Sequence, residues 1–395
     1  MRARRAGNAA AGAKASAACY FVAAVGPAPL GSVVCCPTAR AARLRAPARN
    51  PPEAVGDAVR TRIPDRMPPH PPTPPWDPPY AIDPSLPPAL PSDGRPAVVT
   101  VGTFDGVHRG HWEVLQEIGR RARRVGGRSI LVTFHPHPLR IVRPEAAPPL
   151  LTTPAEKREI LAESGLEYVV FLPFTRTLQQ YPARRFVEEI LLGRLHMDEL
   201  VIGYDHGFGK GREGTVDTLR EIGLELGFGV DVVEAFQVDG QPASSSRIRG
   251  LIAGGEVAAA APLMGRFYHV EGVVVQGERK GRELGFPTAN IEVGDPEKML
   301  PKEGVYAVYG WVNGERLPGL LHLGPRPTFA GFAPTVELWL MDWSGDLYGS
   351  RVRVDFVQRI RDIVPFPSVD ALIAAMHEDA RRGREMLGVG PREDG

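Results

Sequence analysis

Residues 98–111 read Val98-Val99-Thr100-Val101-Gly102-Thr103-Phe104-Asp105-Gly106-Val107-His108-Arg109-Gly110-His111. The β-branched run at the start of this stretch predicts a buried strand. Gly102 and Gly106 then allow a tight turn with a close approach of the backbone. Apolar residues at helical spacing follow, so we expect His108 and His111 to lie on one face of a first helical turn.

A strand, a glycine-rich turn and a helix N-terminus together predict a phosphate site. The free N–H groups of the helix and its partial positive charge favour an anion there. Two imidazoles beside it can donate hydrogen bonds to phosphate oxygens and stabilise the charge that grows as a phosphoanhydride breaks. Taken alone, a His-x-x-His pair also fits a metal pair or two surface histidines. The strand and turn that precede it favour phosphate.

The composition limits the classes of protein that this chain can represent. A length of 395 residues is enough for about two to three domains. The net charge of +1 gives no signal for nucleic acid or for an acidic membrane surface, and we expect neither as a partner. The three cysteines are Cys19, Cys35 and Cys36, so the rest of the chain forms no disulfide and no thiolate metal site. This pattern fits a reducing compartment, and we expect the protein in the cytoplasm.

Residues 1–95 differ in composition from everything that follows. Residues 1–50 contain eight Lys or Arg and no Asp or Glu, and residues 68–91 contain twelve prolines in 24 positions. Three interpretations compete: an organelle or export signal, a disordered tail, or a start assigned too early, with Met67 or a later residue as the true beginning. The uncharged stretch at 15–39 is interrupted by Gly and Pro, which argues against a spanning helix. We favour a disordered extension with a doubtful start.

Predicted strands and helices alternate in residues 96–262. Strands are expected at 128–134, 168–172, 199–203 and 230–236, and helices at 153–164, 183–192 and 216–226, with a further helix opened by Ser244. This alternation indicates a parallel sheet covered on both faces. Ligands of such sheets bind at the carboxyl ends of the strands, where the segments 135–138, 204–212 and 245–249 should converge.

The pattern changes near Pro262, where we place a boundary, and residues 263–390 form the second predicted domain. Strands are expected at 267–275, 305–312, 317–323, 335–343 and 351–357. Short strands with Gly and Pro turns suggest a small antiparallel barrel. A closing helix follows, with Ser368 as its cap.

Residues 277–290 form a loop in which glycines alternate with cations, Arg279, Lys280 and Arg282. A plain surface hairpin and a phosphate-binding loop both fit this pattern. Thr288 and Asn290 lie two apart, so in a strand they face the same way. A hydroxyl and an amide oxygen are hard ligands that suit Mg²⁺ beside phosphates.

Glu337 lies in an alternating stretch whose other face is apolar. The alternation places Glu337 and Trp339 on one face, so the carboxylate lies beside a large aromatic ring. A partly desolvated carboxylate suits a general base. An ordinary outward-facing glutamate fits the same strand.

Together these motifs resemble the bacterial bifunctional riboflavin kinase/FAD synthetase family, over nearly all of residues 97–390. The matching segments are residues 102–111, 134–138, 203–214, 245–249, the Gly-Phe-Pro-Thr-Ala-Asn string at 285–290, 326–329, Glu337 and 345–349. The Phe-Pro-Thr-Ala-Asn string is close to diagnostic of the riboflavin kinase module. The resemblance implies a Rossmann-like nucleotidyltransferase domain followed by a small antiparallel kinase barrel.

The family resemblance also implies two reactions and a set of site residues. The barrel would phosphorylate riboflavin with ATP to FMN, and the N-terminal domain would adenylate FMN with ATP to FAD and pyrophosphate. Catalytic roles fall on Glu337, as general base, and on His108 and His111, at the ATP phosphates. The implied ATP- or phosphate-binding residues are Gly102, Phe104, Asp105, Gly106, Ser246, Arg247, Gly277, Lys280, Gly281 and Arg282. The implied flavin-binding residues are Arg326, Thr328 and Phe329, and the Mg²⁺ ligands are Thr288 and Asn290.

Several positions depart from the family pattern. His135, His206-Gly207, His322, Trp339 and Ile363 stand where other residues are more common. These departures bear on kinetics and substrate preference more than on reaction type. The alternatives are a chain with one active module, its adenylyltransferase degraded at 205–207, and a flavin-binding regulator without turnover. We expect a monomer or weak homo-oligomer.

The composition of residues 1–95 leads to a first testable prediction. Because this stretch cannot support a core, we expect it to pack against nothing and to be dispensable. A chain that begins near Ser92 should keep both activities, as measured by the formation of FMN and FAD. Loss of folding in the shortened chain would refute this expectation.

Overall fold

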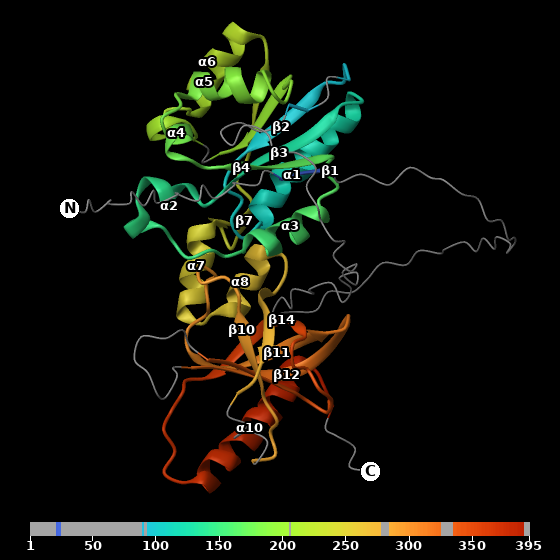
Figure 1. The fold of residues 1–395 in the computed structure, drawn as a ribbon, viewed down its shortest axis with the longest axis vertical. Helices are drawn as coiled ribbons and strands as arrows, with labels where there is room; N and C mark the ends of the chain where they lie inside the picture. The colour runs from blue at the N-terminus through green and yellow to red at the C-terminus, as the bar shows by residue number, and fades with distance from the viewer. Residues whose placement is uncertain are drawn as a thin grey trace, which may run out of the picture.

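Two modules joined by a helix pair make up the described part of the chain, as the computed structural model shows for residues 21–24, 89–90, 93–204, 207–277, 284–324 and 335–390. The N-terminal module (residues 93–243) is an α/β sandwich, and the barrel module (residues 266–390) is a closed barrel with a final helix. Between them lie the junction helices, α7 and α8 (residues 245–264) (Figure 1).

The central sheet has the strand order β1-β4-β3-β2-β5-β6. Its strands are β1 (Phe21–Ala24), β2 (Ala97–Val101), β3 (Arg128–His135), β4 (Tyr168–Pro173), β5 (Glu199–Gly203) and β6 (Gly229–Val233). Strands β2 to β6 pair in parallel, and β1 adds antiparallel to β4 at the edge. A short hairpin of β7 (Gln237–Val238) and β8 (Gln241–Pro242) follows the sheet.

Helices cover both faces of this sheet. They are α1 (Arg109–Arg124), α2 (Pro138–Val142), η1 (Pro144–Ala146), α3 (Pro154–Ala162), α4 (Arg176–Gln179), α5 (Ala183–Phe186) with the π turn η2 (Val187–Leu192), η3 (Lys210–Arg212) and α6 (Val216–Leu226). Apolar residues of α1 and α3 form one core with the sheet, and those of α4 to α6 form the other. The predicted parallel sheet with two covered faces is therefore confirmed, and its loops at the carboxyl ends face the junction helices (Figure 1).

The start of α3 shows how local sequence fixes an element. Thr153 caps the helix by accepting a hydrogen bond from the backbone N–H of Glu156, whose side chain accepts one from the backbone N–H of Thr153 in return. Pro154 occupies the first helical position, where no backbone donor is needed. The predicted cap and proline position are both present.

The barrel closes in the order β10-β13-β12-β11-β14-β9. Its elements are β9 (Tyr268–Val275), β10 (Ala289–Val293), β11 (Gly304–Val312), β12 (Glu315–Gly324), β13 (Thr335–Leu340), β14 (Arg351–Arg361) and α10 (Val369–Leu387). Ser368 caps α10, as predicted, by accepting from the backbone N–H of Ala371. The predicted antiparallel barrel with a closing helix is confirmed, and β10 is a strand that the pattern missed.

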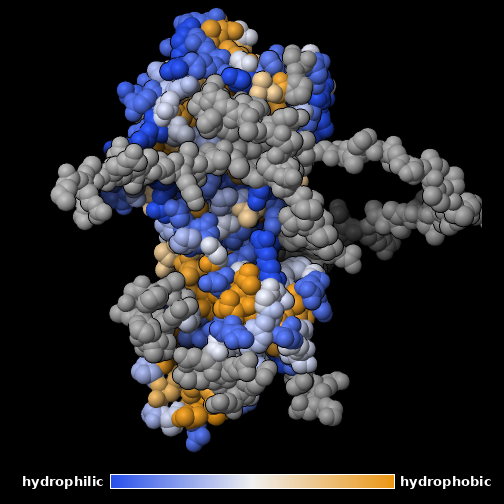
Figure 2. Space-filling view, in the orientation of Figure 1, coloured by the Kyte–Doolittle hydropathy of each residue, from blue (hydrophilic) through white to orange (hydrophobic). Residues whose placement is uncertain are grey.

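The junction helices α7 (Ser245–Gly254) and α8 (Val257–Met264) share a buried core with the barrel. Pro262, near which the sequence placed a boundary, lies inside α8 rather than in a linker. Apolar side chains gather on the visible surface over these helices and the adjoining end of the barrel (Figure 2), where Ala258 and Ala259 are exposed. Within the described residues, none of the helices combines the length and apolarity needed to cross a membrane.

The expectation that residues 1–95 pack against nothing is wrong at two places. The strand β1 (Phe21–Ala24) pairs with β4, because extended backbone can satisfy the open edge of the sheet. Leu90 is only 5% exposed in the core of the N-terminal module, and its backbone N–H donates to the carbonyl of Arg194 at 2.9 Å. The rest of this extension lies outside the described residues, and its expected disorder stays a prediction.

Because Leu90 is buried, a chain that begins near Ser92 should be less stable than the full chain. Leu90→Ala in the full chain should lower the free energy of unfolding by about 2–3 kcal/mol, since it removes a buried side chain and leaves a cavity. Urea denaturation of the two full-length proteins measures this difference. Ala89→Gly, at the exposed neighbouring position, is the control, and equal stability of Leu90→Ala and wild type would contradict the packing.

Candidate active sites

The first candidate site is the turn between β2 and α1. Phe104 and Val107 have positive φ angles of 46° and 36°, and Gly106 has a φ of 79°. A Cβ on Gly106 would lie 2.8 Å from a Leu151 methyl carbon, so no larger residue fits there. The turn is thus held tightly, as the glycines predicted.

His108 and His111 come together at the start of α1. His108 is the N-cap, and its ring stacks on that of His111 with centroids 3.7 Å apart and an interplanar angle of 18°. The Phe104 ring lies against His111 at 4.6 Å. The backbone N–H of His111 donates to Nδ1 of His108, which leaves the Nε2 proton of His108 available to a ligand.

Both imidazoles are neutral at physiological pH. Burial, reinforced by the nearby Arg266 guanidinium, lowers the pKa of His108 to about 4. Burial and the neighbouring His108 hold the pKa of His111 well below its usual range. Each neutral ring keeps one N–H, which can donate a hydrogen bond to an anion.

Asp105 is buried behind this turn, with 1% of its surface exposed. Its carboxylate accepts hydrogen bonds from the backbone N–H groups of Leu151 and Thr152, from the Thr152 hydroxyl and from Arg249. Burial opposes ionisation, yet the charges of Lys157 and Arg249 and the two backbone donors hold the pKa of Asp105 below its ordinary value. The carboxylate organises the turn, and its predicted contact with phosphate stays a prediction.

Helix α7 approaches the same turn with its first residues. The Ser245 hydroxyl donates to the backbone carbonyl of Asp105 at 2.9 Å, so the predicted convergence of this segment with the β2–α1 turn is observed. The Arg247 guanidinium donates to the carbonyls of Val238 and Gln241 in the β7–β8 hairpin. Roles for Ser246 and Arg247 at phosphate remain predictions.

Two buried cations complete the site and were missed by the sequence analysis. Lys157 donates to the Thr103 carbonyl at 2.7 Å, and burial lowers its pKa to about 8. Arg266 donates to the carbonyls of Gly106 and Val107, and burial lowers its pKa to about 10. Lys157 lies on the apolar face of α3 beside Ile160 and Leu161. A lysine at such a position in the sequence could have indicated a buried cation.

The second candidate site lies on the barrel, where β10 and β13 pair. Asn290 is directly opposite Glu337, and His322 of β12 is opposite Glu337 on the other side. Directly opposed residues have neighbouring side chains on one face of the sheet. Glu337 and Trp339 are half-buried while Val336, Leu338 and Leu340 are buried, so the predicted alternation of faces is confirmed.

Of the two predicted metal ligands, Asn290 lies opposite Glu337, and Thr288 directly precedes β10. A Cβ on Gly277 would lie 1.9 Å from Nδ2 of Asn290, so the asparagine side chain occupies the space that glycine leaves. Phe286 is buried edge-on against Trp339, with ring centroids 4.9 Å apart, and also contacts His377 of α10. Phe286 therefore anchors the segment that carries Thr288.

Several predicted residues cannot be located. These are Lys280, Gly281, Arg282, Arg326, Thr328 and Phe329, together with Asp205 and the departure at His206, and all lie outside the described residues. Their predicted roles stay predictions.

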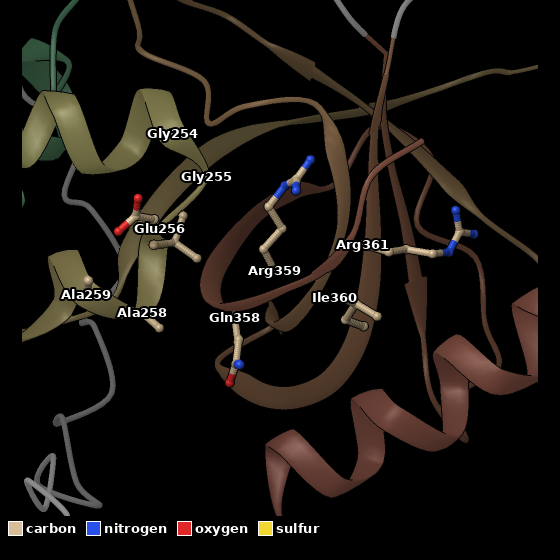
Figure 3. A pocket seen from close by; sticks show the side chains of 10 residues that line it. Gly254, Gly255, Glu256, Ala258, Ala259, Gln358, Arg359, Ile360 and Arg361 are labelled. Atoms are coloured by element: carbon tan, nitrogen blue, oxygen red, sulfur yellow. The ribbon is translucent and has the colours of Figure 1, made fainter. Parts of the chain in front are cut away.

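A surface pocket of about 380 Å³ lies between the junction helices and β14 (Figure 3). Residues 254–259 and 358–361 line it, and none of them belongs to either candidate site. Arg359 donates to Asp362 and to the Glu303 carbonyl, and Arg361 forms an ion pair with Asp379. This pocket therefore belongs to the junction between the modules and to neither of the two candidate sites.

Comparisons with known proteins match the two modules separately. The family model described as FAD synthetase matches residues 90–247, and the one described as riboflavin kinase matches residues 264–387. The bifunctional riboflavin kinase/FMN adenylyltransferase of Escherichia coli (strain K12) is 37% identical over 300 residues, which cover 76% of this chain and 95% of that protein. The protein of the same name from Bacillus subtilis (strain 168) is 32% identical over 287 residues, 72% of this chain and 90% of its own.

A solved structure shares the fold of most of the chain. It is described as a macrolide-efflux protein from Streptococcus pneumoniae, with a TM-score of 0.67 and 29% identity over 73% of this chain and 94% of that one. The chain belongs to the family of bifunctional riboflavin kinases/FMN adenylyltransferases. The predicted family and its two enzyme activities, both of which use ATP, are confirmed.

The geometry of the histidine pair leads to a prediction for the adenylyl step. His108→Ala or His111→Ala should lower the turnover number for FAD formation from FMN by about a hundredfold, the scale for loss of a transition-state donor. FMN formation from riboflavin should stay unchanged, because Glu337 lies in the barrel. Separation of the flavins after incubation with ATP measures both rates, and an equal fall in the two would reject the assignment of two sites.

Proposed function

We propose that the two activities are divided between the modules, with adenylylation of FMN in residues 96–262 and phosphorylation of riboflavin in residues 263–390. The division is supported by the different family models that match the two parts of the chain. It is also supported by the separate clusters of polar side chains around His108 and around Glu337. We further propose a cytoplasmic enzyme that is a monomer or weak homo-oligomer.

In the adenylylation, a phosphate oxygen of FMN attacks the α-phosphorus of ATP. The bond from that phosphorus to the bridging oxygen breaks, and pyrophosphate leaves. The N-terminus of α1 and the N–H groups of the two imidazoles stabilise the negative charge on the reacting phosphate. Gly102 and Gly106 let the backbone approach the phosphates, the turn residues Phe104 and Asp105 hold that backbone, and Ser246 and Arg247 meet them from α7.

In the phosphorylation, the ribityl hydroxyl oxygen attacks the γ-phosphorus of ATP and ADP leaves. Glu337 accepts the hydroxyl proton as the new bond forms. Thr288 and Asn290 offer hydroxyl and amide oxygens of the kind that Mg²⁺ accepts beside phosphates, and the ion would neutralise charge on the β- and γ-oxygens. The cross-strand pairing of Asn290 with Glu337 is the observation that carries this proposal, because it sets the base beside a metal ligand.

The remaining kinase residues follow from the same assignment. We propose that Gly277, Lys280, Gly281 and Arg282 bind the ATP phosphates, since glycines and cations suit a phosphate loop. We propose that Arg326, Thr328 and Phe329 contact the flavin.

Two nearby aspartates are weaker candidates for the base. Asp342 has a φ of 55° and forms an ion pair with Arg384 of α10 at 2.7 Å. Asp346 accepts a hydrogen bond from the backbone N–H of Tyr348 at 3.0 Å, which is a turn contact. Because both aspartate carboxylates already have such partners, Glu337 is the better candidate for the general base.

The substitution Glu337→Gln tests this assignment. It keeps the shape of the side chain but cannot accept the proton, so the turnover number for FMN formation should fall by about a hundred- to ten-thousandfold. Riboflavin binding, followed by flavin fluorescence, and FMN adenylylation should persist. Glu292→Gln, an exposed position on β10, is the matched control. Turnover near the wild-type value in Glu337→Gln would remove Glu337 from the mechanism.

A further inference from the structure

Residues 150–152 connect the two modules through their backbone. The backbone N–H of Leu150 donates to the carbonyl of Glu297 at 2.7 Å, and the backbone N–H of Met299 donates to the carbonyl of Leu150 at 2.8 Å. Residues 297–299 belong to the barrel module and follow β10. The N-terminal module therefore contributes this segment to a parallel bridge with the barrel.

The same segment binds the β2–α1 turn on its other side. The backbone N–H groups of Leu151 and Thr152 donate to the Asp105 carboxylate at 3.0 and 3.1 Å. The Thr152 hydroxyl oxygen accepts from the backbone N–H of Gly106 at 3.0 Å. Whatever fixes residues 150–152 also fixes the turn that leads to His108.

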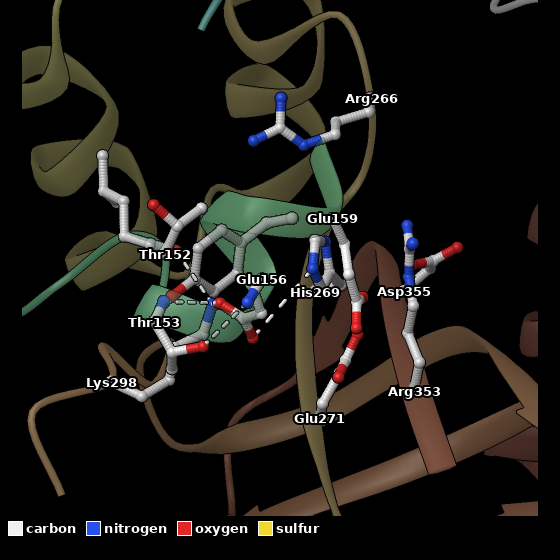
Figure 4. A network of polar contacts seen from close by, with 12 residues as sticks. Thr152, Thr153, Glu156, Glu159, Arg266, His269, Glu271, Lys298, Arg353 and Asp355 are labelled. Atoms are coloured by element: carbon white, nitrogen blue, oxygen red, sulfur yellow. Dashed lines mark hydrogen bonds and ion pairs between the residues drawn. The ribbon is translucent and has the colours of Figure 1, made fainter. Parts of the chain in front are cut away.

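Lys298 of the barrel fixes that segment with a buried charge. Its Nζ, on a side chain that is 1% exposed, donates to the Leu151 carbonyl at 2.8 Å and to Oε2 of Glu156 at 2.6 Å (Figure 4). It also lies 4.6 Å from the centroid of the Tyr268 ring. Because both charges are buried, removal of either leaves the other without its partner.

Glu156 transmits the contact to the first turn of α3. Its Oε2 also accepts the backbone N–H of Thr153, which closes the capping box of the helix. The next residue, Lys157, donates to the Thr103 carbonyl in the β2–α1 turn. Two chains of contacts thus link Lys298 to the β2–α1 turn, one through Leu151 and one through α3.

We propose that Lys298 is a positioning residue for the adenylylation of FMN, although it belongs to the kinase barrel. This inference rests on the proposed assignment of adenylylation to the N-terminal module. The ammonium of Lys298 holds Leu151 and Glu156, and these hold the turn in the geometry in which the histidine N–H groups meet the phosphate. A small misplacement of such a turn is enough to lose much of the rate.

The full-length variants Lys298→Met and Glu156→Gln test the proposal. Met fills the space of the lysine stem without its charge, and Gln keeps the capping hydrogen bond without the ion pair. In each variant, kcat for FAD formation from FMN should fall by about ten- to a hundredfold. KM for FMN and kcat for riboflavin phosphorylation should change by less than about twofold, since the lost interaction acts on alignment rather than on binding.

Matched controls come from the same interface. Glu159 of α3 faces Glu271 of β9 (Figure 4), near Arg351 of β14, and burial together with Glu271 raises the pKa of Glu159 to about 7. These side chains contact neither residues 150–152 nor the β2–α1 turn in the described interactions. Glu159→Gln makes the same chemical change as Glu156→Gln, and Arg351→Met removes a cation as Lys298→Met does. Both control variants should leave FAD formation unchanged.

The outcomes separate a positioning role from a stabilising one. All assays are run well below the melting temperature of each variant, and kinase turnover reports the folded fraction of the same sample. An equal fall in both activities, or unchanged FAD formation, would overturn the proposal. If Lys298→Met does not fold, Glu156→Gln decides alone. His108→Ala is assayed in parallel. If FAD formation does not change in that variant, the assignment of adenylylation to the N-terminal module is rejected instead.

Discussion

The buried carboxylate of Asp105 is the constraint around which the proposed adenylyl site is built. A desolvated carboxylate is stable only when donors surround it, and here the donors come from residues 151–152 and from Arg249 of α7. Neither segment is close to Asp105 in sequence. The turn that holds His108 is therefore complete only when α7 and the segment before α3 have both docked against it.

The electrostatics of that turn suit an anionic substrate. Lys157 and Arg266 are buried, and each donates to a backbone carbonyl of the turn. Burial, reinforced by Arg266, lowers the pKa of both nearby imidazoles, and His108 and Lys157 add to this effect at His111. For the phosphate binding that we propose here, the donors are already oriented and the cations are already buried, so little reorganisation would be needed.

Local patterns in the sequence were sufficient for the fold class and for the local structure around the central residues of each candidate site. The strand, glycine turn and helix at 98–111 and the alternation around Glu337 are properties of neighbouring residues, and both appear as predicted. The roles of Arg249, Arg266 and Lys298 depend on partners more than 140 residues away, which periodicity cannot reveal. Strand β1 was missed because its four residues lie in a stretch rich in Ala, Gly and Pro, where edge pairing decides the structure.

Main-chain atoms supply one or both sides of several contacts between the modules. Arg266 binds the carbonyls of Gly106 and Val107, Lys298 binds that of Leu151, and Leu150 pairs with Glu297 and Met299 through backbone groups alone. Backbone groups are the same whichever side chain is attached. A substitution that keeps the backbone in place can therefore leave these hydrogen bonds intact, provided that Gly106, the two long cations and Glu156 are retained.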